Sequence, residues 1–226
     1  RKILPSGKNL GINITYKEQN SPKGLPEAFI IGEHFIKKDN VCLILGDNFF
    51  YGQSLSDQLL INKKLKKGAK IILHKVKDPE KYGVAKLNNK KKIIKIIEKP
   101  KKQFSNYAIT GLYYFDNNVV NLAKKLKISN RGELEITDLL NMYLKKNKLN
   151  FDIIGRGGAW LDSGSIDDFY KTSNFVSSIE NRQGFKIACL EEIALNNKWI
   201  KKRDIFKAIK FYGNCEYSKY LKKIIS

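Results

Sequence analysis

The sequence predicts an α/β fold: a mostly parallel, mixed sheet flanked by helices, with an inserted β-rich lobe and a helical C-terminus. Two observations carry this prediction. Apolar, strand-like runs alternate with amphipathic, helix-like runs early in the chain, which is the pattern of βαβ units with parallel strands. The middle of the chain then holds short strand-like runs separated by turn residues, and this spacing is typical of antiparallel or mixed β additions.

The first elements follow from composition and period. Residues 12–19, INITYKEQ, are rich in β-formers and predict a strand. Residues 25–36 have helical periodicity with a proline near the first turn, and VCLILGD (41–47) predicts a buried strand. Residues 53–68 predict an amphipathic helix that ends at glycine, and residues 69–76 predict the next strand.

The later elements are three short strands, two helices, a returning strand and a long helix, in that order: residues 82–88, 92–100, 107–115, 119–128, 134–147, 149–155 and 165–184. Ser165 is expected to cap the long helix. No repeat and no flexible linker divides the 226 residues. We therefore expect one domain over 1–226, with the core and lobe at about 1–186 and a helical region at about 187–226.

Composition limits the classes of partner. The net charge of +21 invites a nucleic-acid interpretation, but only five of the 43 basic residues are arginine and the lysines form short, scattered clusters. We interpret them as a solvated surface and expect no nucleic-acid partner. No apolar run is long enough to span a membrane, so no membrane partner is expected. The three cysteines are widely spaced, which fits a reducing cytoplasm without a disulfide framework or zinc site.

Two carboxylates stand where strand-like runs end. Asp47 follows the apolar run VCLILG, and Asp162 follows Trp160 and Leu161 in AWLDSGS. In open α/β sheets, ligands bind outside the carboxyl ends of the strands. Two such carboxylates can hold one Mg²⁺, which prefers oxygen ligands together with phosphate and water. The residues alone leave open that each Asp is a turn or cap residue.

Three further segments suit a nucleotide and a phosphorylated sugar. Residues 19–29 place the amide of Gln19 and a glycine before a helix, which suits hydrogen bonding to a base edge. YGVAKL (82–87) pairs an aromatic residue with a glycine. IIEKP (96–100) ends a strand with Glu98 and Lys99, which could accept hydroxyl hydrogen bonds and meet a phosphate. An exposed ion pair is the alternative for these last two residues.

Eight motifs in order resemble those of the glucose-1-phosphate thymidylyltransferases, a family of sugar-nucleotide pyrophosphorylases. They are Q-x-x-P-x-G-L-x-x-A, LGDN-x-x-YG, DPE-x-YGV, EKP, SNYA-x-TGLY-x-D, RGELEITD, RG-x-AWLD-x-G and E-x-RQG. The resemblance covers nearly the whole chain and thins after Ala194. It implies a Rossmann-like nucleotidyltransferase fold whose β-rich lobe binds the sugar.

The resemblance also implies roles for individual residues. Gln19 and Gly24 would contact thymine, and Asp47 and Asp162 would hold Mg²⁺. Asp47, Lys99 and Asp162 would be the catalytic residues, with Lys99 on the sugar phosphate. Gly111 and Trp160 would shape the wall. The residues around glucose 1-phosphate would be Tyr82, Gly83, Glu98, Lys99, Ile109 and Arg131.

The implied reaction joins dTTP and glucose 1-phosphate into dTDP-glucose and pyrophosphate by Mg²⁺-dependent, in-line displacement at the α-phosphorus. Such an enzyme would serve cytoplasmic nucleotide-sugar biosynthesis for polysaccharides, including the dTDP-rhamnose pathway, and would be a homo-oligomer, a tetramer by resemblance. The attacking phosphate is already an anion, so the chemistry requires positioning and charge neutralisation rather than a protein nucleophile.

One family feature does not occur in the sequence. The family opens with a glycine-rich loop, G-G-x-G-T-R-L, whose amides and arginine hold the triphosphate. We therefore expect a segment to be missing upstream, and we expect the 226-residue chain to be inactive until that segment is restored. Two alternatives stay open: a non-catalytic fragment that binds a nucleotide sugar, and a uridylyl- or cytidylyltransferase of the same family.

Overall fold

The computed structural model describes residue 4 and residues 6–226, which form two compact units. One unit is Lys17–Phe169, and the other joins the N-terminal residues up to Tyr16 to Tyr170–Ser226. The first unit contains the sheet and all of the residues singled out above. The second is helical.

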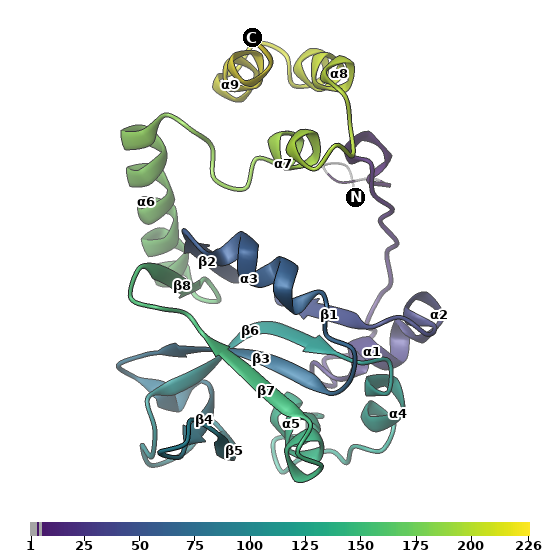
Figure 1. The fold of residues 1–226 in the computed structure, drawn as a ribbon, viewed down its shortest axis with the longest axis vertical. Coiled ribbons are helices and arrows are strands. Elements are labelled where there is room, and N and C mark those ends of the chain that lie inside the picture. The colour runs from purple at the N-terminus through teal and green to yellow at the C-terminus, as the bar shows by residue number, and fades with distance from the viewer. Residues whose placement is uncertain (1–3, 5) are drawn as a thin grey trace. The chain divides into compact units, whose positions relative to one another are not determined.

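The main sheet of the Lys17–Phe169 unit has six strands (Figure 1). Its strands follow the spatial order β5-β4-β6-β3-β7, and β1 also pairs with β6. Their bounds are β1 (Val41–Ile44), β3 (Ala69–Lys75), β4 (Gly83–Leu87), β5 (Ile93–Glu98), β6 (Tyr107–Phe115) and β7 (Leu149–Ile153). Strand β6 is buried from Ala108 to Phe115 because it runs through the centre of the sheet, which explains its continuous apolar and aromatic sequence.

The balance of pairings differs from the predicted one, although the mixed α/β class is confirmed. Among the described strands, β3 and β7 form the one parallel pair, and every other pair is antiparallel. As the early alternation predicts, β1 and β3 run in one direction, and β7 also runs with them. The expectation of a mostly parallel sheet is wrong because β6, from the β-rich middle segment, inserts between β1 and β3 and runs against both.

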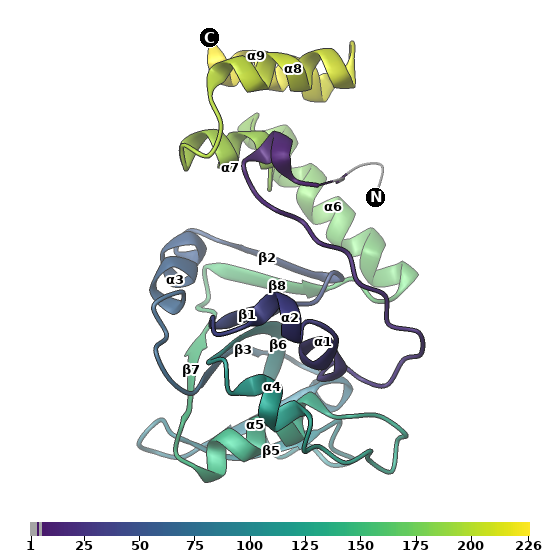
Figure 2. The same ribbon diagram turned by 90° about the vertical axis from the view of Figure 1, so that its right-hand side faces the viewer.

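A second, two-stranded sheet joins distant segments. Strand β2 (Asn48–Gly52) pairs antiparallel with β8 (Gly158–Asp162), and the register sets Asn48 opposite Asp162. The two strands lie side by side in Figures 1 and 2. Because Asp47 immediately precedes β2, this pairing brings the two predicted metal ligands to the same end of one ribbon.

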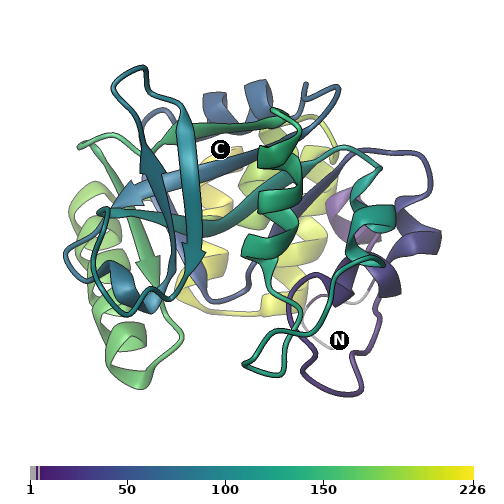
Figure 3. The ribbon, with the colours of Figure 1, turned by 90° about the horizontal axis from the view of Figure 1, so that it is seen from below.

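Helices cover the sheet of this unit and close its core. Their bounds are α1 (Glu27–Ile31), α2 (Glu33–Ile36), α3 (Leu55–Asn62), α4 (Val119–Ala123) and α5 (Ile136–Lys145), with a 3-10 turn, η2, at Pro79–Lys81. Helix α5 crosses one face of the sheet, as the view from below shows (Figure 3). The ring of Phe115 contacts those of Phe29 and Tyr143, with centroids 5.2 and 5.6 Å apart. The Tyr143 hydroxyl donates to Asp116 Oδ1 at 2.8 Å, so this buried ring keeps a polar partner.

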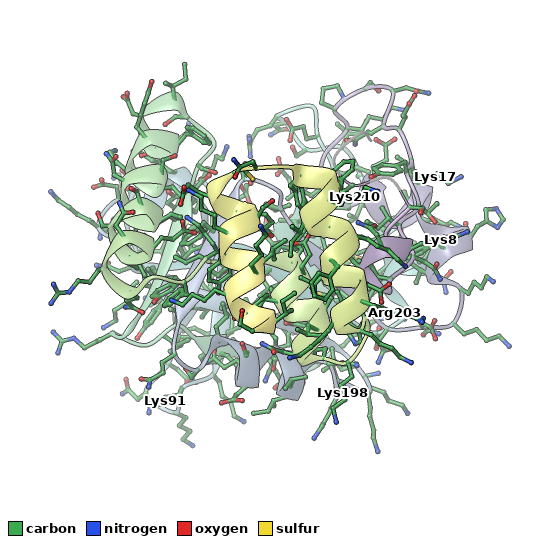
Figure 4. All side chains as sticks on the ribbon, turned by 90° about the horizontal axis from the view of Figure 1, so that it is seen from above. Lys8, Lys17, Lys91, Lys198, Arg203 and Lys210 are labelled. Carbon is green, nitrogen blue, oxygen red and sulfur yellow. The ribbon has the colours of Figure 1, made fainter. Side chains whose placement is uncertain are left out.

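The helical unit has its own small core. Its elements are η1 (Lys8–Leu10), most of α6 (Ile166–Gln183), α7 (Leu190–Asn196), α8 (Lys202–Tyr212) and α9 (Glu216–Ile225). Ile205 and Leu221 are fully buried between them. Figure 4 shows Lys198, Arg203 and Lys210 at separate points along α8 and the turn before it. None of the helices that the structure describes has the length and apolarity needed to cross a membrane.

Most predicted elements are confirmed, with differences in extent. The predicted helix over 25–36 is two short helices, α1 and α2, and the predicted helix over 119–128 ends at Ala123. The predicted strand over 12–19 does not form: these residues are mostly exposed, and no described strand pairs with them. The predicted helix over 53–68 is shorter, since the lysine-rich tail after Asn62 leaves the helix. The predicted cap is present, and the Asp168 amide donates to Ser165 Oγ at 3.1 Å.

Candidate functional site

One pocket of the Lys17–Phe169 unit gathers the predicted chemistry. It has a volume of about 240 Å³ and is lined by the middle of β6, by residues at or near the ends of β1, β4, β5 and β8, and by the loop before α5. All the residues predicted to bind metal or sugar phosphate line it: Asp47, Tyr82, Gly83, Glu98, Lys99, Ile109, Arg131 and Asp162. Larger hollows of about 380 and 610 Å³ lie elsewhere, but neither combines paired carboxylates with the Lys99–Arg131 cations. We therefore take the 240 Å³ pocket as the candidate functional site, on the basis of its lining residues.

The two aspartates converge beside Gly164. A methyl group placed on Gly164 would lie 3.2 Å from Asp162 Oδ1 and 3.5 Å from Asp47 Oδ2. The backbone fixes this arrangement, because Ser163 donates its amide and its hydroxyl to the Asp47 carbonyl at 2.8 and 2.6 Å. Asp162 Oδ1 also accepts the Gly164 amide at 3.0 Å. The structure thus brings together the two carboxylates that the sequence separates by more than a hundred residues.

Glu98, Arg131 and Glu135 form a charged cluster in the lining of the same pocket. Arg131 Nη1 lies 3.5 Å from Glu98 Oε1 and 3.4 Å from Glu135 Oε2. Burial raises the pKa of Glu98, and repulsion by Glu135 raises it further. A hydrogen bond from Thr137 and the positive charges of Arg131 and Lys99 partly offset that increase in pKa. The cluster offers carboxylate acceptors and a guanidinium to a polar, anionic ligand.

Lys99 lines the pocket and has an unusual backbone conformation. Its φ is 37°, in the left-handed region that few residues other than glycine adopt. Its amide donates to the Tyr82 carbonyl at 3.0 Å, which ties the end of β5 to the start of β4. Strained backbone of this kind concentrates at functional positions, because the surrounding structure must hold it in place.

Aromatic rings form the wall that Trp160 was expected to shape. Trp160 is 8% exposed and contacts Tyr82 edge-on, with ring centroids 5.0 Å apart. His74 meets the same indole, with centroids 6.2 Å apart. Burial raises the pKa of Tyr82, and the nearby carboxylates, Asp162 foremost, raise it further, so its hydroxyl stays neutral.

Gln19 and Gly24 lie together, beside the pocket rather than in its lining. Gln19 Nε2 donates to the Gly24 carbonyl at 3.3 Å and to Glu27 Oε2 at 2.6 Å. Gly24 has φ +100°, and a Cβ there would lie 2.1 Å from the Leu134 carbonyl oxygen, so only glycine fits. Leu134 itself lines the pocket. The predicted base-binding pair is thus adjacent to the cluster, with the Gln19 amide engaged by Glu27.

Among the lining residues that were not singled out from the sequence, three contact a predicted site residue. These are Asn48, Glu135 and Thr137. Asn48 follows Asp47 in the LGDN motif, and the other two lie in RGELEITD. The motifs therefore contained the signal, although the residue types alone did not distinguish these side chains from ordinary turn and cap residues.

The fold and the pocket fit the class of α/β enzymes that handle phosphorylated ligands: paired carboxylates suit a divalent cation, and lysine and arginine suit phosphate. The described residues contain no cluster of three or more His, Cys, Asp or Glu side chains that could hold a metal. A cation on Asp47 and Asp162 would therefore complete its coordination with substrate phosphate and water.

Comparison with known proteins agrees with this class. The model of the nucleotidyl transferase family matches residues 1–179. The chain is 44% identical over 225 residues to glucose-1-phosphate thymidylyltransferase of Neisseria meningitidis, covering 100% of this chain and 78% of that protein. It is 38% identical to the protein of that name from Mycobacterium tuberculosis, covering 99% and 77%. The chain belongs to the nucleotidyl transferase family and, within it, to the glucose-1-phosphate thymidylyltransferase family of enzymes.

Solved structures show the same fold. A Bacillus anthracis protein assigned as a glucose-1-phosphate thymidylyltransferase, in complex with sucrose, aligns with a TM-score of 0.68 and 39% identity, covering 77% of this chain and 69% of that one. A UDP-glucose pyrophosphorylase complexed with UDP-glucose aligns with a TM-score of 0.64 at 23% identity, covering 73% and 66%, and this likeness concerns the fold.

Proposed function

We propose that the chain transfers a thymidylyl group from dTTP to glucose 1-phosphate, yielding dTDP-glucose and pyrophosphate. The observation that carries the proposal is the convergence of Asp47, Asp162, Glu98 and Lys99 on one pocket of a chain in this family. In the reaction, a phosphate oxygen of glucose 1-phosphate attacks the α-phosphorus of dTTP. The bond from that phosphorus to pyrophosphate breaks as the new bond forms.

The residues present fit a bound Mg²⁺. Asp47 Oδ1 accepts a hydrogen bond from Asn48, and Asp162 Oδ1 accepts one from Gly164. Within the part of the chain that the structure describes, the second oxygen of each carboxylate receives no such bond, so one oxygen of each is available to a cation. When bound, Mg²⁺ would neutralise phosphate charge and orient the triphosphate.

The other side chains position the acceptor. Lys99 would offset the repulsion between the phosphate of glucose 1-phosphate and the triphosphate. Glu98 would accept hydrogen bonds from sugar hydroxyls, and Arg131 would hold its carboxylate in place. Gly83 lets the side chains of Thr137 and Glu98 pack against its backbone, because a Cβ there would lie 2.8 Å from Thr137 Cγ2 and 3.2 Å from Glu98 Oε2.

The test is release of pyrophosphate from glucose 1-phosphate with dTTP, UTP or CTP, in the presence and absence of Mg²⁺. It is run on the 226-residue chain and on a version joined to the family's glycine-rich loop, with Asp162→Asn as the inactive control. The proposal requires Mg²⁺-dependent turnover and a preference for dTTP. Preference for UTP or CTP would reassign the nucleotide. Tight binding of dTDP-glucose without turnover in either version would identify a binding protein instead.

We propose further that the chain forms a homo-oligomer. The family resemblance supports this, and so does α8, on which the side chains of Phe206 and Phe211 are 62% and 75% exposed. Light scattering during gel filtration would measure the state. A mass of a single chain at all micromolar concentrations would contradict the proposal.

A further inference from the structure

Asn48 connects three parts of the pocket through one side-chain amide. Its Oδ1 accepts the Gly111 amide at 2.8 Å and the Trp160 indole N–H at 2.6 Å. Its Nδ2 donates to Asp47 Oδ1 at 2.8 Å. Strand β6, strand β8 and the β1–β2 turn therefore meet at a residue that itself opens β2.

The chemistry of the partners fixes which way this amide faces. A backbone N–H and an indole N–H can only donate, so the atom that faces Gly111 and Trp160 must be the amide oxygen. The NH₂ group is then left to face Asp47, whose ionised carboxylate can only accept. Rotating the amide by half a turn would set two donors against N–H groups and an oxygen against a carboxylate, so the observed orientation is the one that satisfies every group.

Space restricts the same side chain. A Cβ on Gly111 would lie 2.6 Å from both Cγ and Oδ1 of Asn48, so Asn48 packs directly on the backbone of β6. Trp160, which holds the other side of the amide, is itself buried against Tyr82. Hydrogen bonding and packing therefore both restrain Asn48, and its Nδ2 passes this restraint to the Asp47 carboxylate through one side-chain hydrogen bond.

We propose that Asn48 is the positioning residue of the metal site: by holding Asp47 Oδ1, it turns Asp47 Oδ2 toward Gly164 and Asp162. This inference rests on the proposed function, because it assumes that Asp47 and Asp162 share a divalent cation. The geometry agrees, since Oδ2 is the Asp47 oxygen that lies 3.5 Å from the Cβ position of Gly164. Hydrogen-bond partners that orient a metal ligand commonly contribute about 10- to 100-fold in metal affinity.

The experiment measures Mn²⁺ binding to the full chain by the electron paramagnetic resonance signal of the free ion, because Mn²⁺ accepts the same oxygen ligands as Mg²⁺. Asn48→Ala should weaken Mn²⁺ binding by about 10- to 100-fold. Asn88→Ala is the matched control. Asn88 is half-buried and lies outside the pocket lining, and its Oδ1 also accepts two backbone amides, from Lys90 and Lys92 at 3.0 and 2.9 Å. The Asn88→Ala variant should bind Mn²⁺ as tightly as the unmodified chain does.

Two further measurements separate positioning from folding. In a Trp199→Phe background, Trp160 is the one remaining tryptophan, and its emission should shift in Asn48→Ala because the indole loses its acceptor. If Asn48→Ala fails to fold, Mn²⁺ binding is measured on Trp160→Phe instead. This variant removes one of the two donors that fix the Asn48 amide, and it should weaken Mn²⁺ binding by a smaller factor.

The outcomes are distinct. If Asn48→Ala folds and its Mn²⁺ affinity is unchanged, the inference is overturned while the metal site stands. If Asn48→Ala does not fold, an unchanged Mn²⁺ affinity of Trp160→Phe overturns the inference in the same way. Equal Mn²⁺ binding by the unmodified chain and Asp47→Asn overturns the metal site of the proposed function, and the positioning role falls with it.

Discussion

One carboxylate oxygen of Asp47 and one of Asp162 lie beside Gly164, the residue two places after Asp162. The ideal Cβ position of Gly164 lies 3.2 Å from one carboxylate and 3.5 Å from the other, so the glycine leaves open the space between them. The pairing of β2 with β8 creates this relationship, because Asn48 is in register with Asp162. A two-carboxylate cation site needs such an opening for the ion and its water ligands.

Gly164→Ala should therefore weaken Mg²⁺ binding by roughly tenfold, because the added methyl group crowds Asp162 Oδ1 and occupies space beside Asp47. Isothermal titration with Mg²⁺ measures the effect. Gly157→Ala is the matched control, since a Cβ there would meet no atom within 4 Å. Equal Mg²⁺ affinities in both variants would show that the ion does not bind between the two carboxylates.

Lys99→Ala should reduce kcat/KM for glucose 1-phosphate by roughly 10- to 100-fold and leave dTTP binding nearly unchanged. The reason is a charge-assisted contact to the sugar phosphate, worth about 1.5–3 kcal/mol. Steady-state kinetics with each substrate varied in turn gives the comparison.

Lys91→Ala controls for the backbone. Lys91 also has a positive φ, 53°, but it lies in the turn between β4 and β5, outside the pocket lining. Both variants place an alanine where a lysine has left-handed backbone, so the effect of that backbone conformation on activity should be similar in the two and cancel when they are compared. Equal losses in the two variants would assign the effect to the backbone rather than to the ammonium group.

The sequence predicted local elements well because their signals are local. The run AKIILHKV predicts β3, and the periodicity of residues 134–147 predicts α5 (Ile136–Lys145), because each pattern records which face is buried. The insertion of β6 between β1 and β3 could not be predicted in the same way. Pairing depends on which distant strands meet, and no window of sequence contains that information.

The candidate site shows the same division. Asp47, Glu98, Lys99 and Asp162 could be selected because strand ends and family motifs mark them. The role of Asn48 could not, because it depends on two donors, Gly111 N–H and Trp160 Nε1–H, that reach it only in the folded chain. The residues that bear charge are visible in the sequence, whereas those that orient the charge become visible in the structure.

Glu98→Gln should stabilise the chain at neutral pH while lowering activity. Burial and Glu135 raise the folded-state pKa of Glu98 above its ordinary value of 4.5. The stability linked to this raised pKa is fully present below pH 4.5, and it is lost as pH rises through the folded-state pKa. Glutamine stays neutral, so the difference in the free energy of unfolding should grow from near zero below pH 4.5 and then level off.

Urea denaturation at a series of pH values measures that difference, and Glu80→Gln, an exposed residue near the same lobe, serves as the control. A stabilisation of Glu98→Gln that is equally large at pH 4 and pH 7 would exclude the proposed cause. We also expect the stabilised variant to turn over glucose 1-phosphate more slowly, because the Glu98 carboxylate would then serve activity at the expense of stability.

Tyr217→Phe should destabilise the helical unit by about 1–3 kcal/mol, because it leaves a buried carboxylate short of a donor. Glu191 is 3% exposed, and its two oxygens accept the hydroxyls of Tyr217 at 2.6 Å and Tyr212 at 2.9 Å.

Tyr220→Phe is the matched control. It removes a hydroxyl that donates at 2.6 Å to Glu192, which is only half-buried and can gain water instead, so a loss of about 0.5–1.5 kcal/mol is expected. Urea denaturation followed by circular dichroism at 222 nm compares the variants. A larger loss of stability for Tyr220→Phe than for Tyr217→Phe would contradict the view that the buried Glu191 carboxylate of α7 stabilises the unit by binding hydroxyls from α8 and α9.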